Sequence, residues 1–205
     1  MRLRHNKYAL DILNESNFTI QKFPYQLNNN VVLEIGMGKG RMINQLAKLH
    51  PENIYIGIEK YSTPALSSYK KLMENNLTNL YLLIGDASQL NEYFTGRCKT
   101  IWLTFSDPWP KKRHFKRRLV YRDFLAQYKN ILDEDGIVYF KSDNDGLYQF
   151  ALEELQYFNA NIIYHTNDLH NCDYDIENHL TDYEEKFHSM GKNINFIAFN
   201  FKKNL

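Results

Sequence analysis

Three glycines at alternate positions separate a strand-like segment from a helix-like segment early in the chain. The sequence there reads Glu34-Ile35-Gly36-Met37-Gly38-Lys39-Gly40. The run Val31–Leu33 before it is typical of a buried parallel strand, and apolar residues recur at helical spacing after Arg41. Glycine lets backbone approach a ligand closely, and the amide groups at a helix N-terminus point outward. This arrangement predicts a nucleotide-type cofactor, unless the glycines only form a tight turn.

The spacing of the glycines argues against a dinucleotide and hence against a dehydrogenase. A dinucleotide site requires Gly-x-Gly-x-x-Gly, whereas here Gly36 and Gly38 are followed directly by Gly40. Glu34 would also place a carboxylate beside a pyrophosphate. A carboxylate suits a cation better, and S-adenosylmethionine carries a sulfonium and an ammonium group. The Glu-x-Gly-x-Gly-x-Gly pattern resembles the first motif of the class I methyltransferases, which implies S-adenosylmethionine as the cofactor.

The size and composition of the chain indicate one globular domain. Its 205 residues are enough for a sizeable core, and we expect a single domain over residues 31–205 after a polar N-terminal arm of residues 1–30. No apolar run approaches the roughly 18 residues of a membrane span, and no export signal is evident. Cys98 and Cys172 lack a CxxC partner, which is typical of a reducing compartment. We therefore expect a cytoplasmic protein without membrane contact.

Strand-like and helix-like segments alternate from Val31 onward. The strands are predicted at 31–35, 54–58, 80–84, 100–105, 137–141, 162–164 and 195–201. One helix should span Arg41–His50, and the next should begin with Thr63 as its N-cap. This alternation predicts an α/β fold with a Rossmann-like, doubly wound, mostly parallel sheet of about seven strands, with helices on both faces and an antiparallel strand near the end.

Acidic residues follow the ends of successive predicted strands. They are Glu34, Glu59, Asp86, Asp107 and Asp143. Ligands of doubly wound sheets bind beyond the carboxyl ends of the strands, so these acids should line one rim. For any single acid, capping a helix or a turn is the alternative interpretation.

Positive charge is concentrated in one short segment. The chain as a whole carries a net charge of +1, yet the segment from Lys111 to Arg118 reads Lys-Lys-Arg-His-Phe-Lys-Arg-Arg. A cluster of this kind predicts contact with nucleic-acid phosphates, and a solvated basic surface is the alternative.

The segment Phe105-Ser106-Asp107-Pro108-Trp109-Pro110-Lys111-Lys112-Arg113-His114 resembles the signature of the bacterial tRNA (guanine-N7)-methyltransferases. Other motifs appear in that family's order, namely Glu34-x-Gly36-x-Gly38-x-Gly40, Gly57-Ile58-Glu59, Gly85-Asp86-Ala87, Lys141-Ser142-Asp143 and Thr181-Asp182-Tyr183-Glu184. The resemblance covers nearly the whole chain from Val31. It implies transfer of a methyl group from S-adenosylmethionine to N7 of guanosine 46 in the variable loop of tRNA, with S-adenosylhomocysteine as the product and no metal.

The resemblance also assigns roles to individual residues. The cofactor is expected to contact Glu34, Gly36, Gly38, Gly40, Glu59, Asp86, Ala87 and Asp107. The substrate is expected to contact Lys111, Asp143, Thr181, Asp182, Tyr183 and Glu184. RNA is expected to contact the basic run Arg113, His114, Phe115, Lys116, Arg117 and Arg118. Chemically, Glu59 can accept hydrogen bonds from ribose hydroxyls and Asp86 from the adenine amino group.

The chemistry of guanine limits what Asp107 can do. N7 of neutral guanine already exposes a lone pair, so we expect Asp107 to position guanine and stabilise the arriving charge rather than to remove a proton. Glu184 can accept the N1–H and exocyclic amino donors of guanine. Thr181 and Glu184 also have the spacing of a capping box, which is the structural alternative.

Several other interpretations stay open or are disfavoured. A noncatalytic RNA-binding protein would not need the row of acids, and enzymes that methylate exocyclic amines usually carry Asn/Asp-Pro-Pro-Tyr where this chain has Asp107 to Pro110. The spacing of His165, His170, Cys172 and His179 fits no common zinc site. The sequence leaves open whether two copies form a homodimer.

Overall fold

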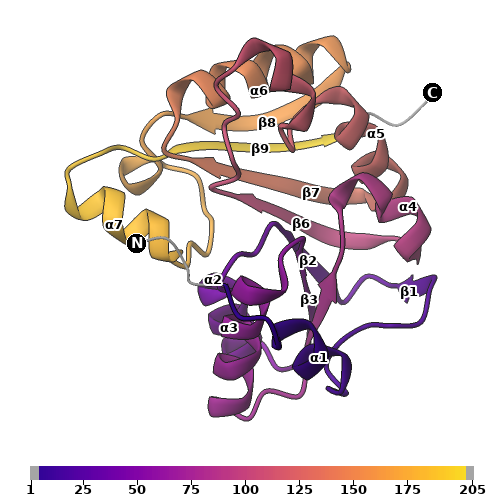
Figure 1. Cartoon of the computed structure of the whole chain (residues 1–205). Helices are drawn as coiled ribbons and strands as arrows, with labels where there is room; N and C mark the ends of the chain where they lie inside the picture. The colour runs from indigo at the N-terminus through magenta and orange to yellow at the C-terminus, as the bar shows by residue number, and fades with distance from the viewer. Residues whose placement is uncertain (1–4, 202–205) are drawn as a thin grey trace.

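The computed structural model describes residues 5–201 and is built on a twisted seven-stranded sheet with the strand order β4-β3-β2-β6-β7-β9-β8 (Figure 1). The strands are β2 (Val31–Ile35), β3 (Ile54–Glu59), β4 (Leu80–Ile84), β6 (Cys98–Thr104), β7 (Leu132–Ser142), β8 (Ala160–Thr166) and β9 (Asn195–Phe201). Strand β9 runs antiparallel to both β7 and β8, and the pairs among β2, β3, β4, β6 and β7 are parallel. The predicted mostly parallel sheet is confirmed.

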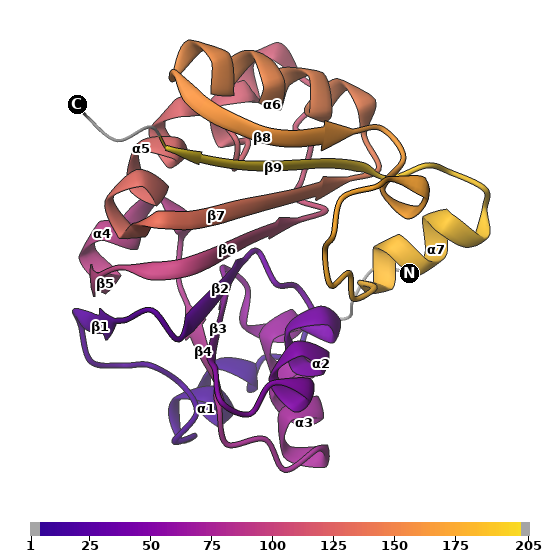
Figure 2. The same ribbon diagram turned by 180° about the vertical axis from the view of Figure 1, so that it is seen from behind.

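Helices cover both faces of this sheet, as predicted (Figures 1 and 2). One face carries α1 (Ala9–Asn14), α2 (Arg41–Leu49) and α3 (Ser62–Glu74). The other carries α4 (Leu90–Tyr93), α5 (Arg122–Ile131) and α6 (Asp145–Tyr157). A seventh helix, α7 (Asp182–Ser189), lies beyond the strand ends beside α2, and three short 3₁₀ turns are η1 (Ala87–Gln89), η2 (Lys112–Arg117) and η3 (Leu169–Asn171).

The two faces follow from the alternation of side chains along each strand. In β6, Ile101 and Leu103 pack with the α4–α6 side, whereas Trp102 between them packs with the α1–α3 side. In β3, Ile56 and Tyr55 divide in the same way. Successive strand residues point to opposite faces, so a strand buried on both sides must be apolar throughout.

The sheet region formed by β7, β9 and β8 has a different cover on the α1–α3 side. There the segment 167–181, which has little regular structure, packs Leu169, Tyr174 and Ile176 on the strands. Tyr174 lies 5.6 Å from Phe196 and 4.9 Å from Tyr164, measured between ring centroids. We call this segment the cover segment.

Two local predictions were wrong. Strand β7 begins at Leu132, five residues before the predicted start, and pairs with Cys98 before a register shift. Thr63 does not cap α3, because the helix already begins at Ser62; its hydroxyl instead accepts a hydrogen bond from the Asn6 backbone at 3.1 Å.

Residues 5–30 pack against the sheet-bearing part of the chain. Ala9 and Leu13 of α1 are buried against α3, and β1 (Tyr25–Leu27) pairs in parallel with β5 (Phe94–Gly96). In the described part of the chain, no helix is long and apolar enough to cross a membrane.

Gly36, Gly38 and Gly40 all adopt left-handed backbone after β2, and the surroundings of Gly38 and Gly40 differ. Gly40 has φ +64°, and a Cβ there would lie 2.1 Å from Ser68 Oγ and 2.6 Å from Ser68 Cβ. Gly38 has φ +56°, and nothing lies within 4 Å of its Cβ position. Gly40 is therefore needed for helix packing, whereas Gly38 borders open space.

We expect Gly40→Ala to destabilise the protein more than Gly38→Ala. Both variants lose about 1–2 kcal/mol because an L-residue is placed in the left-handed region. Gly40→Ala also overpacks the contact with Ser68, which adds roughly 1–3 kcal/mol. Urea unfolding of both variants measures the free energies of unfolding, and equal losses would contradict the packing role of Gly40.

Candidate active site

The acids predicted to share one rim follow neighbouring strands at their carboxyl ends. Glu34 is the second-last residue of β2 and Glu59 the last of β3, and the later strands β4, β6 and β7 are followed by Asp86, Asp107 and Asp143. The strands β4-β3-β2-β6-β7 are adjacent in that order and parallel, so the acids lie along one edge of the sheet. The predicted row is present as a structural feature.

Glu34 is a buried carboxylate with spare bonding capacity. Its side chain is 2% exposed, and its Oε1 accepts a hydrogen bond from Thr104 Oγ1 at 2.7 Å. The other oxygen, Oε2, is buried without a hydrogen-bond partner among residues 5–201. Burial raises the pKa of Glu34 to about 7, although the Thr104 hydroxyl and the charge of Lys141 act in the opposite direction. A cation beside Oε2 would relieve this burial cost.

Glu59 holds the glycine loop in place. Its Oε2 accepts from the Gly38 backbone at 3.0 Å and its Oε1 from the Tyr61 backbone at 2.9 Å. Burial raises the pKa of Glu59, those backbone bonds lower it, and the charge of Asp107 raises it further. Asp107 therefore lies close enough to Glu59 for the two carboxylates to interact.

Asp86 is more exposed and is paired with a cation. Its Oδ1 accepts from the Ser88 backbone at 2.9 Å, and Lys60 Nζ lies 2.7 Å from its Oδ2. The lysine bond and the Ser88 bond lower the pKa of Asp86. Asp86 thus caps η1, the alternative considered for it, and Ala87 is the first residue of that turn.

The loop that carries Asp107 is shaped by backbone strain and by one arginine. Phe105 and Trp109 have φ values of +49° and +41°. Arg118 donates from Nε to the Pro108 carbonyl at 2.9 Å and from Nη2 to the Trp109 carbonyl at 3.2 Å. Asp107 itself is exposed at the surface of this loop.

The basic segment divides into residues that face solvent and residues that face the protein. The exposed group is Lys111, Lys112, Arg113, Lys116 and Arg117, and His114 is half-buried beside Trp109. Phe115 packs edge-on against Tyr121 at 5.3 Å, and the Arg118 guanidinium lies over the Phe150 ring at 4.3 Å. The exposed lysines and arginines form a cationic surface that begins at Lys111, four residues after Asp107.

The first turn of α7 lies near the same loop. Thr181 Oγ1 accepts from the Glu184 backbone at 3.0 Å, which is half of the capping box considered above. Tyr183 is 60% exposed, and its ring is nearly parallel to that of Phe105, with centroids 6.4 Å apart. Asp182 lies 3.6 Å from Arg41, the first residue of α2.

The Glu184 carboxylate points into the protein, where its Oε2 lies 2.7 Å from Lys141 Nζ. Its role in reading guanine therefore stays a prediction. No sequence pattern indicates a role for Lys141 or for Arg41, and Arg41 forms an ion pair with Glu185. The available signal for Lys141 was its position directly after the apolar run from Ile137 to Phe140.

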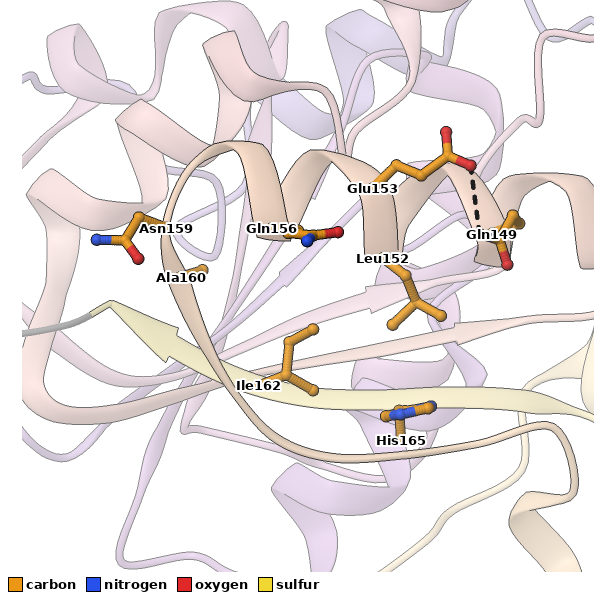
Figure 3. A pocket seen from close by; sticks show the side chains of 8 residues that line it. All are labelled: Gln149, Leu152, Glu153, Gln156, Asn159, Ala160, Ile162 and His165. Atoms are coloured by element: carbon orange, nitrogen blue, oxygen red, sulfur yellow. Dashed lines mark hydrogen bonds between the residues drawn. The ribbon is translucent and has the colours of Figure 1, made fainter.

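A groove of about 430 Å³ lies elsewhere, between α6 and β8 at the edge of the sheet (Figure 3). Its lining includes Gln149, Gln156, Ile162 and His165. No predicted site residue is among its lining residues. The acids at the carboxyl ends of β2, β3, β4, β6 and β7 are therefore a separate feature.

Proteins of known sequence resemble this chain over almost its whole length. A family model described as "Putative methyltransferase" matches residues 28–197. A tRNA (guanine-N(7)-)-methyltransferase of Metamycoplasma hominis is 61% identical, over 98% of this chain and 100% of that protein. A protein of the same name from Mycoplasmopsis agalactiae is 54% identical, over 96% of this chain and 97% of its own.

Solved structures share the fold at low sequence identity. The 16S rRNA methyltransferase KamB has a TM-score of 0.63 at 11% identity, over 87% of this chain and 90% of its own. SMU.1697c of Streptococcus mutans, solved in complex with SAH, has a TM-score of 0.56 at 11% identity, over 85% and 90%. These likenesses confirm the predicted class I methyltransferase fold. The family model and the sequence identities show that the chain is an enzyme that belongs to the tRNA (guanine-N7-)-methyltransferase family.

Proposed function

We propose that this protein transfers a methyl group from S-adenosylmethionine to N7 of a guanine in tRNA, at position 46 of the variable loop. The observation that carries the proposal is the row of acids at the carboxyl ends of β2, β3 and β6 beside an exposed cationic surface. The names of the relatives support the same reaction and substrate. In this proposal residues 31–205 form the methyltransferase domain.

The residues around the glycine loop fit a cationic cofactor. The buried Glu34 Oε2 needs a donor or a cation, and the space above Gly38 allows a ligand to approach the backbone. Glu59 keeps lone pairs free beside its two backbone bonds, which suits ribose hydroxyls. S-adenosylmethionine supplies an electrophilic methyl group next to a sulfonium. The residues of this chain hold and orient that group.

Asp107 acts on the guanine rather than on a proton. The N7 lone pair of neutral guanine is free, and positive charge spreads over the ring as the methyl group arrives. A carboxylate beside the ring stabilises the transition state more than the ground state. Arg118 fixes this carboxylate's loop through the carbonyls of Pro108 and Trp109.

The exposed cations position the tRNA. Lys111, Lys112 and Arg113 follow Asp107 within six residues, and Lys116 and Arg117 extend the same surface. Contacts to phosphate set register and orientation, whereas the base itself must be selected inside the site. RNA held along this surface would present an unstacked base to Asp107 and Tyr183.

The proposed reaction predicts that methylation requires nitrogen at position 7. We expect labelled S-adenosylmethionine to label a tRNA transcript with guanine at position 46, and 7-deazaguanine there to abolish labelling, because its carbon has no lone pair. Mapping of the labelled atom completes the measurement. Labelling that survives the 7-deazaguanine substitution would refute N7 methylation at that position.

The raised pKa of Glu34 predicts that cofactor affinity depends on pH. The acid is protonated below its pKa of about 7, and a bound cation favours the ionised form, so affinity should rise by roughly tenfold between about pH 6 and pH 8. The same shift makes the cofactor-free protein less stable as pH rises from 4.5 to about 7.

Calorimetric titration of S-adenosylmethionine at several pH values measures the cofactor affinity. Glu34→Gln keeps the Thr104 bond but cannot ionise, so its weaker affinity should be independent of pH over this range. A parent protein whose affinity is flat with pH would contradict the placement of Glu34 beside the cation.

Asp107→Asn tests the electrostatic role of the acid. We expect a loss of about 100-fold in the single-turnover rate at saturating tRNA, since one preorganised electrostatic group is removed. Cofactor affinity should change little, and Glu153→Gln, an exposed change on α6, should match the parent. A near-normal single-turnover rate for Asp107→Asn would exclude the proposed role.

A further inference from the structure

A lysine and a glutamate form an ion pair inside the protein, between β7 and α7. The side chains of Lys141 and Glu184 are both 0% exposed, and Lys141 Nζ lies 2.7 Å from Glu184 Oε2. The same ammonium donates to Asn178 Oδ1 at 2.9 Å and to the His179 carbonyl at 3.1 Å. All three of its donors are therefore used.

The Glu184 carboxylate is held from several sides. Its Oε1 accepts from Asn178 Nδ2 at 2.7 Å, and His170 Nε2 lies 3.4 Å from the same oxygen. Its backbone is fixed by the Thr181 hydroxyl. A carboxylate with these partners has no side turned to solvent, so it is not presented to the edge of a base.

Lys141 also connects this pair to the cofactor end of the sheet. It follows Phe140 on β7 and is paired in register with Thr104 of β6, whose hydroxyl donates to Glu34. The charge of Lys141 reaches Glu34, as its effect on the pKa of that acid indicates. The buried Lys141 ammonium thus interacts with two carboxylates, that of Glu34 in β2 and that of Glu184 in α7.

The Lys141–Glu184 ion pair lies beside a part of the chain that has no regular secondary structure. Residues 172–181 of the cover segment have no helix or strand, so the start of α7 depends on side-chain contacts for its position. Buried ion pairs rarely stabilise a fold more than apolar residues of the same shape, but they can select one arrangement among several. Here the arrangement selected is the one that places Tyr183 beside Phe105, two residues before Asp107.

We propose that Lys141 and Glu184 are positioning residues that hold Tyr183 at the reacting base, and that Glu184 does not itself read the guanine edge. This inference rests on the proposed function. It concerns the placement of the substrate and not the identity of the methylated atom.

The experiment compares Lys141→Met, Glu184→Gln and the double variant on tRNA with guanine or inosine at position 46. Inosine lacks the exocyclic amino group, so it reveals whether a residue contacts that group. The measurements are the single-turnover rate at saturating tRNA, the affinity for S-adenosylmethionine and the unfolding midpoint. Glu153→Gln is the control, since this exposed residue lies on α6.

Misplacement of Tyr183 predicts a rate loss of about 10- to 100-fold in each single variant. The double variant should be no slower than the slower single variant, because residues that act as a unit are not additive. The ratio of guanine to inosine rates should equal that of the parent in every variant. Cofactor affinity should stay within about twofold of the parent value in Glu184→Gln, whereas Lys141→Met also removes a charge that acts on Glu34 and so changes the affinity.

Three results would overturn the inference. One is a guanine-to-inosine ratio that collapses only in Glu184→Gln, which would show direct reading of the amino group. Another is a set of variants that all react at the parental rate. The third result applies only if both single variants unfold. The double variant leaves no unpaired charge in the interior, so it can still fold. If this folded double variant reacted at the parental rate, the ion pair would not position Tyr183. A slow, folded double variant supports the inference, and a parent that does not methylate guanine refutes the proposed function instead.

Discussion

Crowding of like charges at one edge of a parallel sheet is the constraint on which the site depends. Parallel strands end at the same edge, so an acid at the end of each of several strands brings carboxylates close together even though like charges repel. Glu34 and Glu59 are both buried there, and burial raises the pKa of both. Ionising these buried carboxylates costs free energy when no cation is near them, and a positively charged ligand would reduce that cost. The glycine loop leaves room for that ligand.

The protein compensates for part of this crowding with internal cations. Lys141 forms an ion pair with Glu184 and its charge lowers the pKa of Glu34, and Lys60 forms an ion pair with Asp86. No lysine or arginine hydrogen-bonds or ion-pairs with Glu34, Glu59 or Asp107 in the contacts of residues 5–201. Lysines of the protein thus neutralise Asp86 and Glu184, whereas Glu34, Glu59 and Asp107 keep their carboxylates for the proposed ligand.

Periodicity in the sequence was sufficient to predict most of the sheet. The bounds of β2, β4 and β9 agree with those expected, since each is an apolar run bounded by polar residues or glycine. The early start of β7 was missed because Asp133, Glu134 and Asp135 are typical of a loop, yet they lie in the strand beyond the core. The acidic composition of these residues disfavours a strand, and they join β7 because the start of this strand pairs with the neighbouring strand β6.

Long-range partners were beyond reach of the sequence alone. Lys141 and Glu184 are 43 residues apart and meet through the cover segment, for which no motif was available. The resemblance identified Thr181 to Glu184 as a functional segment, but it could not indicate that one of these side chains turns inward. Likewise, the sequence shows six lysines and arginines among the eight residues from Lys111 to Arg118, but it could not indicate that Arg118 is half-buried while the other five are exposed.

That division affects how the cationic segment would be interpreted by mutagenesis. Arg118 carries the same charge as its neighbours, but its guanidinium is tied to the main chain of the loop that carries Asp107. A uniform alanine scan would report Arg118 as the strongest RNA ligand of the segment, although its loss would act by distorting the loop. Guanidinium ion added to an Arg118→Ala variant distinguishes the two roles. It can occupy the cavity left by the Arg118 side chain and restore activity, but it cannot replace a phosphate contact at the surface.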